Sequence, residues 1–452
     1  MSPRRLILPL ALAQFICSFA GSNMNVMITD ISEDLGTDVM GVQTAITLFL
    51  LIMAILMIPC SKLTDRWGRK RCLNLGLALY GIGALLSAVA PNLGVLILGN
   101  SVFEGVGTAL LIPPVYILAT LWFTDLTTRA WAFGAISGLG GIGAAAGPLI
   151  GGLITTGISW RAAFIFQAAV VATILLLSHR LADPLPPNPT RAFDAVGAVL
   201  SAVGMFCVVF GILQAGTNNA LFALFVMLGL AILAGFFFYI RARERAGKEP
   251  LLSTGLFKNR TCNLALVTQT VQWLLLMGTS FVVSVFLQTV RGYSAIGTGV
   301  VFTAATVGIL VSSFAAQRLA KRYSHRTLIV AGFLVTLAGI GLLLGFVDES
   351  SRVIAFVPGL LLVGLGLGGM LTPSVTVVQS SFPEALQGEI SGLSRSVSNL
   401  GSTFGTAIAG TILVSVVATG NRSYGIAMIT LAGFGLIGLS AALRIPAKLG
   451  KA

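Results

Sequence analysis

The chain has 452 residues, of which 56% are hydrophobic and 10% charged, and its mean hydropathy is +0.95. This composition excludes a soluble globular protein, because one water-soluble core cannot bury so large an apolar fraction. Five scattered cysteines, with no Cys-x-x-Cys pair and no neighbouring histidine, predict neither a disulfide framework nor a metal site.

Apolar runs of about 20 residues follow one another along the chain, which is the length at which a helix crosses a bilayer. Continuous apolar runs favour helices, because a membrane barrel would show alternation. We therefore expect an all-α integral membrane protein with fourteen transmembrane helices. The predicted spans are residues 6–28, 40–60, 73–90, 94–118, 130–155, 161–179, 193–213, 219–241, 261–287, 296–317, 327–346, 353–380, 390–418 and 424–443.

The basic residues predict the orientation of these spans. If both termini are cytoplasmic, all of the 28 lysines and arginines except Arg161, Arg291, Arg352 and Arg422 fall on the cytoplasmic side. An excess of Lys and Arg on cytoplasmic loops is general in membrane proteins. The pattern predicts a multi-pass protein of the plasma (inner) membrane, and it accounts for the net charge of +13 without a nucleic-acid partner.

A charge-dense stretch, residues 61–71, joins the second and third spans with the sequence Ser-Lys-Leu-Thr-Asp-Arg-Trp-Gly-Arg-Lys-Arg. We expect a short loop in which Gly68 supplies the positive φ of a tight reversal. Two interpretations remain open. The cations are either a topology anchor, or Asp65, Arg66 and Arg69 clamp helix ends together as a gate.

The fourth span contains Glu104, the one acid that these spans place near the middle of the membrane. An ionisable group at that depth is costly and tends to face a cavity or a partner. Glu104 is therefore a candidate site for a proton or a substrate cation, and it is the residue that we expect to carry proton coupling. The alternative is a protonated glutamate that only packs between helices.

The fifth span is rich in glycine, which allows backbone to pack against backbone. Pro148 removes one internal hydrogen bond and bends the helix. The residues of interest are Gly143, Gly147, Pro148, Gly151 and Gly152. A tight helix crossing without a role in transport would explain them equally well.

Two connectors divide the chain. Residues 180–192 are rich in proline, and residues 241–260 are basic with mixed charges. They predict an N-terminal six-helix bundle (1–182), a connector with two extra helices (183–248) and a C-terminal six-helix bundle with a short cytoplasmic tail (249–452). A degenerate copy of the 61–71 stretch at residues 319–326 supports two related halves.

Polar residues within the spans are candidates for lining a substrate cavity, although each is explained at least as well by hydrogen bonding between helices. They are Asn23, Asn25, Gln269, Gln272, Trp273 and Gln379. Arg395 is expected to extend to the cytoplasmic surface. No nucleotide-binding sequence, metal cluster or nucleophile motif is visible, so the sequence predicts neither enzymatic activity nor a cofactor.

The run Asp65-Arg66-x-Gly68-Arg69-Lys70 resembles the loop between helices 2 and 3 of the major facilitator superfamily. The glycines from Gly134 to Gly152 resemble that family's exporter motif, and six plus two plus six spans resemble its 14-helix drug:proton antiporter branch. The resemblance implies a major facilitator fold and alternating access. It also implies that Asp65 meets a helix of the second half and that Arg69 pairs with an acid after span four, for which Asp125 is available.

Some positions depart from that pattern. Ser61 replaces the first glycine of the loop motif. Ala20 and Ser101 stand where relatives of the antiporter branch usually carry aspartate and arginine. Two charged groups commonly tied to proton coupling are therefore missing.

The predicted function is export of hydrophobic or amphipathic small molecules by a monomer in membrane lipid, with proton antiport as the driving process. The few charges within the spans argue against small anionic substrates. Two alternatives remain open. One is a facilitator or lipid transporter without proton coupling, which Ala20 and Ser101 favour. The other is a transporter-like receptor or structural membrane protein.

Overall fold

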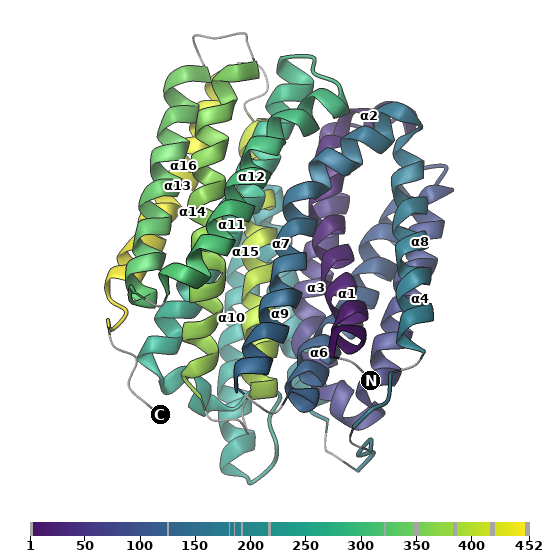
Figure 1. Cartoon of the computed structure of the whole chain (residues 1–452), viewed down its shortest axis with the longest axis vertical. Helices are drawn as coiled ribbons and strands as arrows, with labels where there is room; N and C mark the ends of the chain where they lie inside the picture. Colours follow the sequence, from purple (N-terminus) through teal and green to yellow (C-terminus); the bar gives the residue numbers. More distant parts are fainter. Residues whose placement is uncertain are drawn as a thin grey trace.

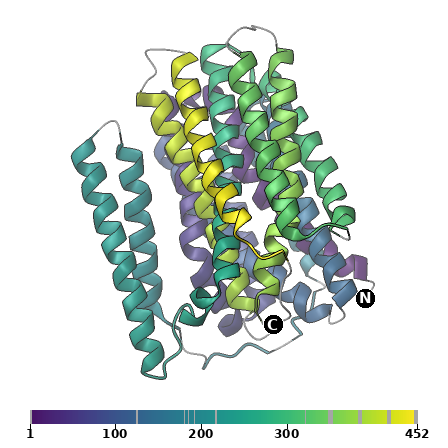
Figure 2. The ribbon, with the colours of Figure 1, turned by 90° about the vertical axis from the view of Figure 1, so that its left-hand side faces the viewer.

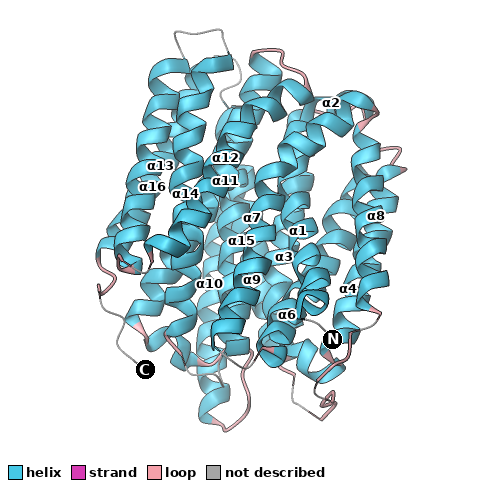
Figure 3. Ribbon diagram, viewed as in Figure 1, coloured by secondary structure: helices cyan, strands magenta, loops and turns pink. Residues whose placement is uncertain are grey.

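The computed structural model describes residues 3–123, 126–179, 181–184, 186–190, 193–215, 218–320, 322–347, 353–382, 387–415 and 421–447. All secondary structure within these ranges is helical (Figure 3). The long helices run side by side (Figure 1). The start of α1 and the end of α16 lie at the same end of the molecule. We call that end of the molecule the basal end and the opposite one the apical end.

Two groups of six long helices pack mainly among themselves. The first bundle contains α1 (Pro3–Asn23), α3 (Val39–Trp67), α4 (Arg69–Ala88), α6 (Gly105–Trp122), α7 (Leu126–Gly157) and α8 (Trp160–Ser178). The second bundle contains α11 (Arg260–Val285), α12 (Ala295–Leu319), α13 (His325–Val347), α14 (Phe356–Ser380), α15 (Gln387–Ser415) and α16 (Asn421–Leu443). Short elements extend or connect them: η1 (Met24–Val26), α2 (Ile28–Asp34), α5 (Leu93–Leu96), η2 (Ile97–Glu104), η3 (Thr254–Lys258), η4 (Phe286–Val290) and η5 (Val353–Ala355).

A pair of helices lies beside the two bundles, namely α9 (Ala195–Gln214) and α10 (Asn219–Arg245). The pair forms a hairpin that stands apart from the rest of the molecule (Figure 2). Only α9 makes extensive contact with α3 and α15, whereas α10 packs chiefly on α9. Exposed apolar side chains such as Met227 and Phe238 cover α10, as expected for a surface that faces lipid.

Every predicted span overlaps a helix, but the count of fourteen membrane-crossing helices is not confirmed. Twelve helices of the described residues are long and apolar enough to cross a membrane. A thirteenth is α7, which bends by 44° between Gly134–Ala144 and Ala146–Gly157. The remaining long helix, α15, is less apolar because it carries many serines and threonines. Packing against α3, α11 and α16 places this helix among protein neighbours.

Residues 61–71 are not the loop that we expected. Helix α3 continues through Trp67 and α4 begins at Arg69, so that Gly68 alone forms the turn. Gly68 has φ of +96° and ψ of 142°, a conformation open essentially to glycine. One residue can therefore reverse the chain, and the charges of the stretch project from helix ends. Residues 30–38, between the first two spans, carry four acids, and this acidic segment is also partly helical, as α2.

We predict that Gly68→Ala destabilises the protein by about 1–3 kcal/mol, the cost of a non-glycine residue in such a conformation. A purified protein in detergent should show a lower midpoint of thermal unfolding. The control is Gly235→Ala on α10, where the added methyl meets nothing within 4 Å. That substitution should leave the midpoint unchanged or raise it, and an equal effect of both substitutions would contradict the prediction.

Candidate functional site

The two bundles meet mainly along two helix pairs, α3 with α15 and α7 with α12. Along the first pair, the Ser396 hydroxyl donates to the carbonyl of Ala54 over 2.8 Å, and Gln43 Nε2 donates to the carbonyl of Thr406 over 3.4 Å. These bonds join residues more than 300 positions apart in the chain. The interface between the bundles is therefore polar on the α3–α15 side.

A cavity lies between the bundles. It is lined from α1, α6 and α7 of the first bundle and from α11, α12, α14 and α15 of the second. An adjoining space shares Gln14, Ser18, Trp273 and Arg395 with it. We call the two spaces together the central cavity.

Three of the six candidate cavity residues line the central cavity, namely Gln269, Gln272 and Trp273 on α11. The side chains of the two glutamines also form hydrogen bonds within the second bundle. Gln272 Nε2 donates to the carbonyl of Leu367 over 3.1 Å, and Gln269 Oε1 accepts from Ser394 over 2.8 Å. Trp273 borders both parts of the cavity.

The other three candidates lie outside the lining of the central cavity. Asn23 is fully buried against Gly151 of α7. Asn25 lies in η1 at the apical end, and Gln379 lies in the last turn of α14. Their spacing in the sequence carried no information about the face of the helix on which each would lie.

Arg395 reaches the central cavity instead of the membrane surface. It lies eight residues into α15, about 12 Å along the helix axis. Its guanidinium lies 4.4 Å from the centre of the Tyr116 ring on α6 and donates to the Tyr116 hydroxyl. That hydroxyl donates to Gln14 Oε1 over 3.0 Å, and Gln14 Nε2 donates to Ser18 over 3.1 Å. A polar chain thus crosses from the second bundle to α6 and α1.

Contacts between the bundles also close the apical end. Asn25 Nδ2 donates to the Ser280 hydroxyl of α11 over 3.4 Å, and Gln288 Nε2 of η4 donates to the Asn25 carbonyl over 2.9 Å. Gln288 Oε1 accepts from the backbone N–H of Thr29 over 3.3 Å. Neutral hydrogen bonds of this kind contribute little individually, so such a closure can break at modest cost.

A charged cluster fixes α2 on α8 at the same end. Asp34 forms an ion pair with Arg161 and accepts from Trp160 Nε1 over 3.0 Å. Both donors lower the pKa of Asp34, with Arg161 contributing most. Arg161 also donates to the carbonyl of Ala90 over 2.8 Å and lies over the Trp160 ring. The acidic segment of the sequence is therefore partly used to hold helices together.

The glycines of α7 lie against two different neighbours. A Cβ on Gly143 would come within 2.3 Å of the Phe15 carbonyl oxygen of α1, and one on Gly147 within 2.1 Å of Ser22 Oγ. On another face, a Cβ on Gly152 would come within 2.5 Å of the Ala295 carbonyl of α12. Pro148 is buried, and its carbonyl approaches Gly299 of α12. The bent helix α7 is therefore packed tightly on both bundles.

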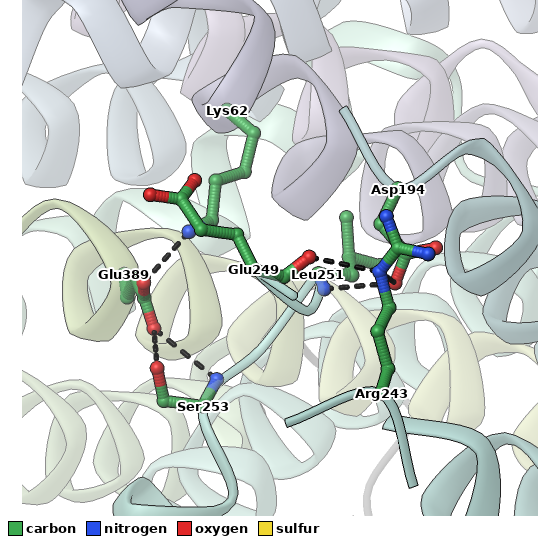
Figure 4. A network of polar contacts seen from close by, with 7 residues as sticks. All are labelled: Lys62, Asp194, Arg243, Glu249, Leu251, Ser253 and Glu389. Carbon is green, nitrogen blue, oxygen red and sulfur yellow. Dashed lines mark hydrogen bonds and ion pairs between the residues drawn. The ribbon is translucent and has the colours of Figure 1, made fainter. Parts of the chain in front are cut away.

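At the basal end an ion pair joins the bundles (Figure 4). Lys62 Nζ of α3 lies 2.6 Å from Glu389 Oε1 of α15, and both side chains are largely buried. Glu389 Oε2 accepts from the Ser253 hydroxyl over 2.8 Å and from the Ser253 N–H over 3.2 Å. This pair could not be predicted, because nothing in the spacing of the sequence relates residue 62 to residue 389.

The segment that supplies Ser253 is held by the hairpin α9–α10. Asp194, at the start of α9, accepts from the Leu251 N–H over 3.0 Å and lies 3.7 Å from Arg243 of α10. Arg243 Nε donates to the Glu249 carbonyl over 2.9 Å. Figure 4 shows the two networks on either side of residues 249–253. The extra helices are thus connected to the ion pair between the bundles.

The predicted gating residues are only partly covered by the structure. The side chain of Asp65 and all of Asp125 lie outside the described residues. Arg66 is exposed, whereas Arg69 is 8% exposed. Asp183 of the proline-rich connector accepts from the N–H groups of Arg69 and Lys70, over 2.6 and 3.3 Å, at the start of α4. This cap on the positive end of the helix dipole was not foreseen.

Glu104 ends η2 and is fully buried within the first bundle. The hydroxyls of Tyr80 and Ser87 face its carboxyl, yet neither carboxyl oxygen has a hydrogen-bond partner within reach among the described residues. Glu104 does not line the central cavity. A carboxyl so enclosed is most stable in its neutral form.

We predict that Gly143→Ala impairs both packing and transport, because the methyl cannot fit against the Phe15 carbonyl. Overpacking of this kind costs about 1–3 kcal/mol. The midpoint of thermal unfolding should fall, and dye efflux from expressing cells should drop with it. Gly138→Ala on the same helix is the control, since its methyl meets nothing within 4 Å. A normal Gly143→Ala protein would disprove the tight packing of α7 on α1.

We predict that Glu389→Gln shifts the molecule towards conformations that are open at the basal end. A charge-assisted hydrogen bond contributes about 1.5–3 kcal/mol, so the open population should rise about tenfold or more. Spin labels at the exposed positions Arg71 and Arg322 would report the distance between the bundles. The exchanged pair Lys62→Glu with Glu389→Lys should restore most of the original distribution. Unchanged distances between the spin labels in Glu389→Gln would show that this ion pair does not hold the basal end closed.

Comparisons with known proteins agree with this architecture. The family model described as Major Facilitator Superfamily matches residues 10–406 and again 265–448. The chain is 30% identical to the puromycin resistance protein pur8 of Streptomyces alboniger, over 92% of this chain and 83% of that protein. It is 30% identical to the multidrug efflux pump LfrA of Mycolicibacterium smegmatis, over 82% and 73%. It is 28% identical to the tetracenomycin C resistance and export protein of Streptomyces glaucescens, over 85% and 71%.

A crystal structure of the peptide transporter POT in complex with sulfate superposes with a TM-score of 0.70. The superposition covers 100% of this chain and 96% of the POT chain, at 18% sequence identity. The two chains therefore share a fold. The long apolar helices make the chain a multi-pass membrane protein. Together with the match of the family model over most of the sequence, the fold establishes that this chain belongs to the Major Facilitator Superfamily.

Proposed function

We propose that this chain is a secondary active exporter of hydrophobic or amphipathic small molecules. The observation that carries the proposal is the central cavity, which lies between two bundles joined at both ends by contacts that can break. Alternating access requires such contacts to open at one end while they hold at the other. Relatives over most of the chain are described as efflux pumps and resistance proteins, which supports export as the direction.

The membrane arrangement belongs to the same proposal. We take α7 and α15 as spans, which gives fourteen, and we place the basal end in the cytoplasm. The basic residues of the 61–71 stretch lie at that end, in agreement with the excess of Lys and Arg on cytoplasmic loops. The protein would then act in the plasma (inner) membrane as a monomer, with the two bundles as its moving parts and α9–α10 as an addition to them.

Within this proposal, Asp65, Arg66, Gly68, Arg69 and Asp125 form the gating region at the basal end. Lys62 and Glu389 extend that region across the bundles, as their 2.6 Å separation supports. The exporter-motif residues Gly143, Gly147, Pro148, Gly151 and Gly152 would let α7 pivot between α1 and α12. Their close approach to both neighbours supports this role.

Protons are the proposed driving ion, with Glu104 as the exchanging group. Its full burial beside the Tyr80 and Ser87 hydroxyls supports a site that binds and releases a proton when its surroundings change. A second candidate function is a facilitator without proton coupling. Two observations favour it: Glu104 lies away from the central cavity, and Ser101 and Ala20 replace charged residues.

We expect a pH gradient to drive substrate uptake into proteoliposomes that contain the wild-type protein, and Glu104→Gln to abolish that acceleration. Exchange of labelled for unlabelled substrate should persist in the variant, since it needs no net proton transfer. Glu33→Gln, which removes an exposed acid, is the matched control. If the transport rate depends on neither the pH gradient nor the Glu104→Gln substitution, proton antiport is rejected and the facilitator without proton coupling is the better description.

A further inference from the structure

The central cavity contains one charged side chain among the described residues that line it, and that side chain is a cation. Arg395 borders both parts of the cavity, and no lining residue of either part is acidic. None of the ion pairs found among the described residues includes Arg395. A guanidinium in a partly enclosed space without a counter-charge leaves an opening for an anion.

The protein orients this guanidinium without neutralising it. The Tyr116 ring lies 4.4 Å from the guanidinium carbon, and the Tyr116 hydroxyl accepts one of its N–H groups. A guanidinium has five N–H donors in a planar fork that matches a carboxylate. The contacts with Tyr116 therefore hold the side chain in place and leave donors for a ligand.

The remaining walls suit an aromatic, apolar body. Trp273 borders both parts of the cavity, and Met53, Met57 and Met277 line the second part. Aromatic faces and polarizable methionines adapt to flat ring systems. Gly141 of α7, where an added methyl would meet nothing within 4 Å, leaves room in the wall.

We propose that the substrates of this chain are amphipathic aromatic molecules that carry an anionic group, which Arg395 binds while Trp273 and the methionines contact the ring system. This inference rests on the proposed export function and narrows its substrate class. It also reverses the expectation from the sequence that the spans lack a cation at the depth of the cavity.

The test uses three probes that share one ring system and differ in charge: 9-anthracenecarboxylate, 9-anthracenemethanol and 9-(aminomethyl)anthracene. The protein is placed in nanodiscs of phosphatidylcholine, so that the lipid adds no net charge. Binding is followed by quenching of tryptophan fluorescence, and Trp273→Phe identifies the part of the signal that comes from the cavity. We expect the carboxylate to bind at least tenfold more tightly than the alcohol, and the amine to bind most weakly.

Arg395→Gln should remove this preference, lowering carboxylate affinity about tenfold or more and leaving the alcohol within a factor of about three. Arg395→Lys should retain only part of the preference, because it keeps the charge but loses the planar fork. Arg444→Gln, which removes an exposed arginine at the basal end, should change nothing. If Arg395→Gln weakens all three probes alike, the residue only supports the bundle interface and the proposal is overturned. Equal binding of the three probes to the wild type, or binding of none, overturns it as well.

A transport measurement separates this inference from the proposed function. Export of the alcohol from proteoliposomes without any preference for the carboxylate would leave the exporter standing and refute the anion site. A charge-dependent preference in binding without transport of any probe would refute the exporter and leave a binding protein with an anion site.

Discussion

The cost of placing charge in an apolar environment determines how this molecule is put together. Only 10% of its residues are charged, and three of those within the bundles find partners at the interfaces between helices. Lys62 and Glu389 pair between α3 and α15, and Arg395 lies over Tyr116 between α15 and α6. Each of these contacts spans the two bundles. The charges that must be sheltered from lipid are therefore the same ones that hold the two bundles together.

Glycine provides a second kind of contact, both within the first bundle and between the bundles. Helices in lipid gain little from the hydrophobic effect and associate through close packing instead. On α7 the glycines at positions 140, 143, 147 and 151 recur every three to four residues and lie against α1, whereas Gly152 lies against α12. Pro148 stands between these two contacts, where the helix lacks one internal hydrogen bond. A rotation of one bundle against the other must therefore be accommodated by α7.

Hydropathy located the helices well, because the length and apolarity of a span are local properties of the sequence. It could not show which helix face lines a cavity, since that depends on residues far away in the chain. Arg395 enters the cavity because Tyr116, 279 positions away, supplies a ring and a hydroxyl. The sequence identifies Gly68 as a turn residue. The continuation of α3 to Trp67 was not predicted, because charged residues at the end of a span are typical of a loop.

In the proposed mechanism, Glu104 has to act on the central cavity across the side chains that separate the two. Cys17 lines the cavity and its thiol lies 3.8 Å from Thr108 Oγ1, one turn beyond Glu104 on the same helical segment. Ser101, by contrast, donates to the Ala45 carbonyl of α3 over 2.8 Å, and Ala20 is buried without a charge. In the proposed mechanism the carboxyl therefore acts on a cavity whose one described charge is Arg395. Coupling between substrate and proton would then have to pass through the packing of the helices between Glu104 and the cavity.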